Sequence, residues 1–277
     1  MSEKYYTKPA LMLPELSVIA LTGIISYFAL NKKTEIPALI IFSETPLGAS
    51  MNALTFISIM AFTAILMLVL VKRGLLRVVK YFIKASLILV SFFLINWYAE
   101  LFLGDYLSWV QSLDMIFLGV SALLAIVLYL FMYSKNELSQ VFAVVIVSSL
   151  TGTFLGISIP IISSIALMIA LIVYDLISVF KGPLKSLVKK ANIEEFAGAV
   201  FTYEGLTIGM GDVVFYSMLA STAMINFGLA EFFTTSLGIL IGVFLSFKIL
   251  EKRELFPGLP LALGLGLFFM VLTVLMH

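Results

Sequence analysis

Charged residues are scarce in this chain of 277 residues, and cysteine is absent altogether. Lys, Arg, Asp and Glu make up 12% of the sequence, whereas a soluble domain usually carries about 25%. Without cysteine, a disulfide framework, a cysteine nucleophile and thiolate metal sites are impossible. The single histidine is His277, which excludes an HExxH zinc motif and a Ser–His catalytic dyad.

Apolar residues dominate the composition instead. They make up 62% of the chain, and the mean hydropathy is +1.14. No water-soluble fold can bury so much apolar surface, so soluble enzymes, disordered segments and nucleic-acid binders are excluded. The net charge of +1 indicates no particular charged partner. The sequence therefore predicts an all-α protein of the cell membrane whose partner is the lipid bilayer and not nucleic acid.

Nine apolar segments are long enough to cross a bilayer, which takes about 20 helical residues. The fifth and sixth come from one stretch, residues 138–180, which as a single helix would be about 65 Å long. This stretch must fold back, and Gly156 to Pro160 is predicted to be the hairpin. The expected spans are 12–30, 50–71, 81–103, 112–133, 138–156, 160–180, 206–226, 230–249 and 257–276.

The basic residues gather on one side of these spans. Fifteen of the 17 lie at the start of the chain or around the connections that follow even-numbered spans, and only Lys32 and Lys33 lie on the other side. By the positive-inside rule, the N-terminus is expected in the cytoplasm and the C-terminus outside. In the longest connection, the segment from Pro183 to Ala191 has one apolar and one basic face, which predicts a helix on the inner leaflet.

Two aspartates lie inside predicted spans, where a carboxylate costs several kcal/mol and usually marks a functional site. Asp175 precedes Lys181 by six residues, about 9 Å of helix, and Asp212 follows Glu204 by eight, about 12 Å. Their helices share one connection, so both carboxyls are expected at one depth, each as the partner of the other. Acids near the predicted interfaces are expected to be solvated, namely Glu15, Glu100, Asp105, Asp114, Glu231 and Glu251.

Two neighbouring carboxyls in a low dielectric share one proton and titrate as a pair. In an aspartic protease the ionised member takes a proton from the attacking water, and the protonated member donates to the peptide carbonyl. The same acids would also suit a proton- or cation-coupled transporter or channel. A structural pair would need no chemistry at all, so the acids alone leave three interpretations open.

Three motifs around the aspartates resemble those of the presenilin and signal peptide peptidase family of intramembrane aspartic proteases. They are Tyr174-Asp175, Gly209-Met210-Gly211-Asp212 and Pro257-Gly258-Leu259-Pro260, which correspond to the family's YD, GxGD and PALP motifs. They fall in order on the sixth span, the seventh span and the start of the ninth, as the family's nine-helix fold requires. The resemblance implies that Asp175 and Asp212 form the catalytic dyad, with no metal and no cofactor.

The GxGD and PxLP segments are expected to bind substrate. Gly209 and Gly211 remove side chains beside the second aspartate, so a substrate backbone can approach closely. Together with Gly205 they would equally suit a small-residue packing face between helices. Pro257 and Pro260 interrupt the start of the last span and free main-chain groups, which at membrane depth must line a cavity or be buried in protein.

The chain is thus expected to have three parts: residues 1–180 with six spans and the YD motif, the cytoplasmic connection 181–205, and residues 206–277 with three spans and the other motifs. Two features depart from the family pattern. Gly258 stands where the family usually has alanine, and the connection has no room for the long autocleaved loop of presenilin. The implied partners are transmembrane helices of substrate proteins with an outside N-terminus, and a homo-oligomer is left open.

The segment from Ala199 to Tyr203 combines β-branched and aromatic residues, so it favours a strand. A helical substrate must be unwound before its peptide bond is accessible. We therefore expect this segment to pair with the unwound substrate through main-chain hydrogen bonds. In the alternative interpretation, these residues extend the seventh helix by one turn.

Reporter fusions test the orientation. A reporter that is active only in the cytoplasm should be active at Met1 and inactive at His277, because an odd number of spans separates them. A fusion near Lys135 should behave like the one at Met1. Activity at both ends would contradict the span count and the orientation together.

Overall fold

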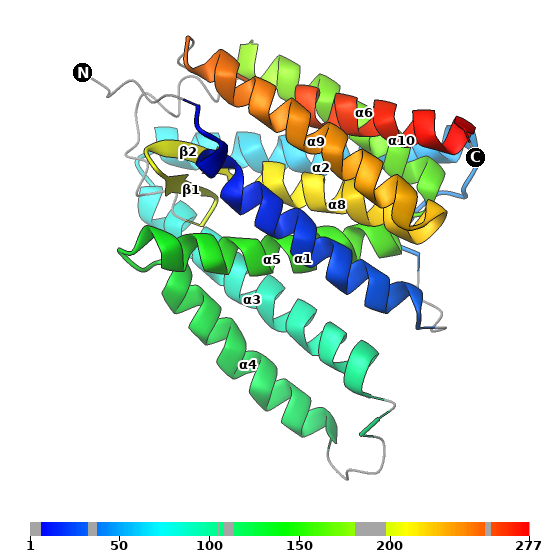
Figure 1. Cartoon of the computed structure of the whole chain (residues 1–277). Helices are drawn as coiled ribbons and strands as arrows, with labels where there is room; N and C mark the ends of the chain where they lie inside the picture. The colour runs from blue at the N-terminus through cyan, green and yellow to red at the C-terminus, as the bar shows by residue number, and fades with distance from the viewer. Residues whose placement is uncertain are drawn as a thin grey trace.

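The computed structural model describes residues 7–32, 38–104, 106–107, 113–180, 198–252 and 256–276. In this part of the chain, nine α-helices form one bundle, with a small hairpin at one end (Figure 1). The helices are α1 Leu13–Leu30, α2 Pro46–Lys72, α3 Leu76–Leu103, α4 Leu113–Met132, α5 Glu137–Ser158, α6 Ile161–Phe180, α8 Met210–Phe227, α9 Leu229–Leu250 and α10 Leu259–Met276. A 3-10 turn, η1 Pro9–Met12, precedes α1, and strands β1 Val200–Tyr203 and β2 Leu206–Gly209 precede α8.

These helices match the nine predicted spans in order. The break between α5 and α6 falls at residues 159–160, where the hairpin was expected. Eight of the described helices are long and apolar enough to cross a membrane, with η1 and α1 counted together. The predicted class, an all-α membrane protein, is therefore confirmed. The interfacial helix predicted from Pro183 to Ala191 lies outside the described residues.

Among the described helices, α8 is the one whose hydropathy is too low for a candidate membrane span, and it lies at the centre of the bundle. Twelve of its 18 residues are buried, and it packs against α1, α5, α6, α9 and α10. A helix covered by protein instead of lipid does not need an apolar surface all round, so α8 can carry hydroxyl side chains. By contrast, α2 buries only Gly48, Ala49 and Ala53 among its 27 residues.

Buried hydroxyl pairs hold α8 against α1. Thr22 Oγ1 and Ser217 Oγ lie 2.7 Å apart, and Ser26 Oγ donates a hydrogen bond of 2.9 Å to Ser221 Oγ. The partners advance by four residues on both helices, so α1 and α8 run in the same direction in a fixed register. Hydrogen bonds of this kind stabilise helix contacts inside membranes, where the hydrophobic effect does not.

The hairpin corrects one predicted boundary. β1 and β2 pair antiparallel, with Val200 opposite Gly209, so the predicted strand is present and the alternative of an extra helical turn is wrong. The seventh span was expected to begin at residue 206, but residues 206–209 form β2. The chain reverses because Glu204 and Gly205 both adopt positive φ, 46° and 80°, as a two-residue hairpin turn requires.

The described chain starts and ends at opposite ends of the bundle. The Thr7 amide donates a hydrogen bond of 2.6 Å to Glu251 Oε1, so the region before α1 and the end of α9 lie together. From there α10 runs to the far end, where the C-terminus is drawn (Figure 1). This arrangement is expected for a chain that crosses the membrane an odd number of times.

Glycines bring α9 and α10 into main-chain contact. A Cβ at Gly238 would lie 2.6 Å from the Leu265 carbonyl oxygen, and one at Gly242 would meet the carbonyl oxygen of Leu261. Main-chain atoms cannot rotate out of the way as side chains can. The spacing of the two helices therefore depends on these glycines.

Gly242→Ala should lower the thermal unfolding temperature in detergent by several degrees, because overpacking typically costs about 1–3 kcal/mol. Gly264→Ala is the matched control, since its Cβ would meet no described atom within 4 Å and alanine is the better helix former. The control should unfold at or above the wild-type temperature. Equal temperatures for the two variants would contradict the close approach of α9 and α10.

Candidate active site

The two membrane aspartates come from adjacent helices. Asp175 lies in the last turns of α6, and Asp212 lies in the first turn of α8. The two helices are in contact, and their carboxyls lie against two consecutive residues, Gly258 and Leu259. Both side chains are half-buried. The structure thus brings together the pair that the sequence pattern singles out.

The start of α10 touches both carboxyls. The Leu259 amide donates a hydrogen bond of 3.1 Å to Asp175 Oδ2. The neighbouring Gly258 faces the other aspartate, since a Cβ there would lie 2.5 Å from Asp212 Oδ2. Glycine at this position therefore lets the Asp212 carboxyl lie against the main chain. That contact gives a physical reason for the departure from alanine.

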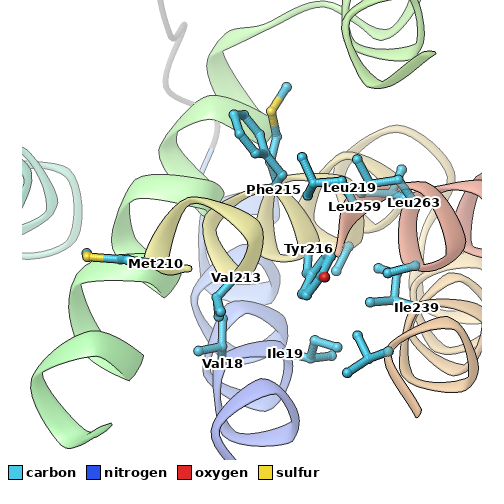
Figure 2. Packing of buried hydrophobic residues seen from close by; sticks show 14 of the residues in the cluster. Val18, Ile19, Met210, Val213, Phe215, Tyr216, Leu219, Ile239, Leu259 and Leu263 are labelled. Carbon is cyan, nitrogen blue, oxygen red and sulfur yellow. The ribbon is translucent and has the colours of Figure 1, made fainter. Parts of the chain in front are cut away.

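Tyr216 completes this arrangement, and the sequence analysis did not identify it. Its hydroxyl donates a hydrogen bond of 3.1 Å to the Gly258 carbonyl oxygen. Its ring is buried between α1 and α10, near Ile19 and Leu259 (Figure 2). The spacing in the sequence could have identified it, because Tyr216 follows Asp212 by four residues and so lies on the same face of the helix.

The prolines act as expected on the main chain. Pro257 precedes α10, and Pro260 is its second residue, a position where the missing N–H disturbs no helical hydrogen bond. The main chain between them was expected to face the active site, and there the Leu259 amide and the Gly258 carbonyl bind the side chains of Asp175 and Tyr216.

The glycines of the GxGD segment do not pack against another helix. Within the described chain, a Cβ at Gly205 or Gly211 would meet nothing within 4 Å, so the interpretation as a helix-packing face is wrong for these two. Gly209 precedes α8, and its Cβ would lie 3.5 Å from the carboxyl group of Asp212. The α8 surface beside Asp212 is therefore open at Gly211, which is exposed.

Two glutamates that were expected to be solvated are buried. Glu15 is 1% exposed and Glu231 is 6% exposed. Hydropathy places both near the ends of spans, but it does not tell which face of the helix they occupy. Glu15 lies on the inward face of α1, one turn before Ile19, which lies near Tyr216 (Figure 2), so a third carboxyl lies beside the site.

The comparisons with known proteins agree on one family. Residues 42–197, more than half of the chain, match the Presenilin family. Presenilin-B of Dictyostelium discoideum is 31% identical over 153 residues, which are 52% of this chain and 32% of that protein. The match thus spans about a third of the length of this relative. The family match ends before Asp212. Asp212 and the start of α10 are therefore assigned to the same site as Asp175 by their contacts in the structure.

Two solved structures of presenilin family intramembrane aspartate proteases, in space groups C222 and P2, are similar to this one. Each has a TM-score of 0.68 and 19% sequence identity. The similarity covers 96% and 98% of this chain and 99% of each of those chains. At this identity the likeness shows the fold, so the predicted presenilin-like bundle is confirmed and the chain is a multi-pass membrane protein.

Proposed function

The chain belongs to the presenilin family, and from this premise we propose that it is an intramembrane aspartic protease. It would hydrolyse peptide bonds in or near transmembrane helices of other membrane proteins. One observation carries the proposal: the start of α10 touches both aspartates, through the Leu259 amide on Asp175 and through Gly258 against Asp212. Two carboxyls held around one turn of main chain suit the activation of a water molecule between them.

In the proposed reaction, the ionised aspartate takes a proton from water while the water oxygen attacks the peptide carbonyl carbon. The protonated aspartate donates its proton to the carbonyl oxygen, which gives a tetrahedral diol. When the diol collapses, the amine leaves with one proton and the pair again shares one. The Leu259 amide holds one oxygen of Asp175, so it orients this carboxyl for the transfer.

The orientation and the partners are also part of the proposal. With the N-terminus in the cytoplasm, the aspartates would lie in the cytoplasmic half of the membrane, because Asp212 follows β2 directly and the hairpin is at this end of the bundle. Substrates would be transmembrane helices with their N-terminus outside. The dyad is complete within one chain, so the chemistry is the same for a monomer and for a homo-oligomer.

Asp175→Asn and Asp212→Asn should each reduce cleavage of a single-span model substrate in detergent by at least about 100-fold, because each removes one of the two proton-transfer groups. Asp114→Asn, at an exposed acid of α4, is the matched control and should cleave like the wild type. Unfolding temperatures establish that all three variants fold. More than about a tenth of wild-type cleavage in either dyad variant would contradict the assignment. Ion flux into proteoliposomes without cleavage would favour the transporter instead.

Among the described residues the sheet has two strands, so the outer edge of each strand carries no further strand. The Met210 amide donates a hydrogen bond of 3.0 Å to the Ala199 carbonyl oxygen. Hydrogen-bonded and non-bonded pairs alternate along antiparallel strands, so Thr202 and Thr207, which face each other, point their main-chain groups toward the outer edges. We propose that the unwound substrate adds as a strand at such an edge, with main-chain hydrogen bonds supplying the register.

Thr202→Pro tests strand addition, because it removes one outward N–H and leaves the bonds between β1 and β2 in place. Cleavage should fall about fivefold or more, as expected for one hydrogen bond, while binding of a dyad-directed transition-state inhibitor stays near wild type. Thr202→Val keeps the N–H and is the control, and Thr207→Pro tests the edge of β2. Wild-type cleavage by both proline variants would contradict strand addition.

A further inference from the structure

The bundle buries a carboxyl that the proposed chemistry does not use. Glu15 lies in the first turn of α1 and is 1% exposed. Neither of its carboxyl oxygens has a hydrogen-bond partner on another described residue. Most buried polar groups have such a partner, and a buried carboxyl without one is costly. The position of Glu15 therefore calls for a physical explanation.

The register of α1 and α8 puts Glu15 beside the dyad. The two hydroxyl pairs show that the helices advance in step. One turn before them, Val18 and Val213 point toward each other (Figure 2). On the neighbouring faces of the two helices, Ile19 lies near Tyr216, and Glu15 and Asp212 each precede these residues by one turn of four. In agreement with this register, Glu15 is buried on the side of α1 that packs against α8, as is Tyr216 on α8.

Other charged groups around α1 do not compete with Asp212. The elements packed against α1 are η1, α5, α8 and α9. Their titratable side chains are Glu137 on α5, Asp212 and Tyr216 on α8, and Glu231 and Lys248 on α9. Of these, Glu137 and Lys248 are exposed and Glu231 lies at the other end of α8, which leaves Asp212 and Tyr216 as the groups nearest to Glu15. Coupling between the two carboxyls is therefore the main electrostatic consequence of placing Glu15 here.

We propose that Glu15 is a positioning residue that sets the pH range over which the dyad holds its single shared proton. The coupling itself follows from the structure, whereas its effect on cleavage rests on the proposed function. When Glu15 ionises, its negative charge favours retention of the proton that the aspartates share. The active, singly protonated dyad then persists to higher pH than two isolated aspartates would allow.

The pH profile of kcat tests this role. Glu15→Gln keeps the size and hydrogen-bonding capacity but cannot ionise, so the alkaline limb should move to lower pH by about half a unit or more while the acid limb stays in place. Glu15→Asp restores an ionisable group and should return the limb toward wild type. An alkaline limb shared by wild type and Glu15→Gln would overturn the proposal.

Glu231→Gln is the matched control for a buried glutamate. Glu231 lies near Gly228, at the far end of α8 from Asp212, about 24 Å along the helix. Its pH profile should coincide with that of wild type. A shift as large as that of Glu15→Gln would mean that the change reflects lost packing, and it would overturn the assignment to Glu15.

Infrared spectroscopy measures the coupling without any cleavage. The band of a protonated carboxyl that is lost in Glu15→Gln identifies Glu15, and Glu15→Asp, which shifts this band, serves if the glutamine variant does not fold. In Asp212→Asn the Glu15 band should disappear at lower pH than in wild type, because the neighbouring charge is gone. Identical titrations would overturn the coupling. A shifted band in a protein that cleaves no substrate would instead overturn the proposed function alone.

Discussion

A carboxyl group inside a membrane bundle has few ways to be accommodated, because water is not there to solvate it. Asp175 and Asp212 are accommodated by polar main chain at the start of α10, where the helix has not yet closed its own hydrogen bonds. The Leu259 amide binds one carboxyl, and the small Gly258 lets the other lie against the backbone. The Tyr216 hydroxyl then donates a hydrogen bond to the Gly258 carbonyl oxygen beside the two acids.

The central place of α8 follows from the same requirement. α8 carries Asp212 and several hydroxyl side chains, so it is too polar to face lipid, and five other helices surround it. Its contacts with α1 include two buried hydroxyl pairs, whose directional hydrogen bonds fix the register of the two helices. That register has a consequence at the site: Ile19 lies near Tyr216, so Glu15 and Asp212, one turn earlier on the same two faces, come close to each other.

Hydropathy was enough to predict the helices, because most of them expose an apolar surface where lipid would lie, and the motif order was enough to pair Asp175 with Asp212. The sequence pattern did not predict strand β2, the burial of Glu15 or the role of Tyr216. These features depend on local backbone conformation and on which side of a helix faces its neighbours. Residues 206–209 are as apolar as a helix start, yet the positive φ angles at Glu204 and Gly205 make them a strand. Glu15 lies near the end of its span, where a residue is usually solvated. Its burial follows from the side of α1 that packs against the bundle, which the sequence does not reveal. Tyr216 looks like an ordinary aromatic until α10 is placed beside it.

The hairpin and the dyad are joined by covalent structure, which bears on how a helical substrate becomes accessible. β2 runs without interruption through Gly209 into the first turn of α8, so a strand bound to the hairpin edge is held at a fixed distance from Asp212. Gly211 leaves the helix surface open on this path, since no described atom lies within 4 Å of its Cβ position. Recognition by main-chain hydrogen bonds reads conformation and not side chains. Selectivity would then depend on which transmembrane helices unwind easily near the hairpin, and much less on their sequence at the cleaved bond.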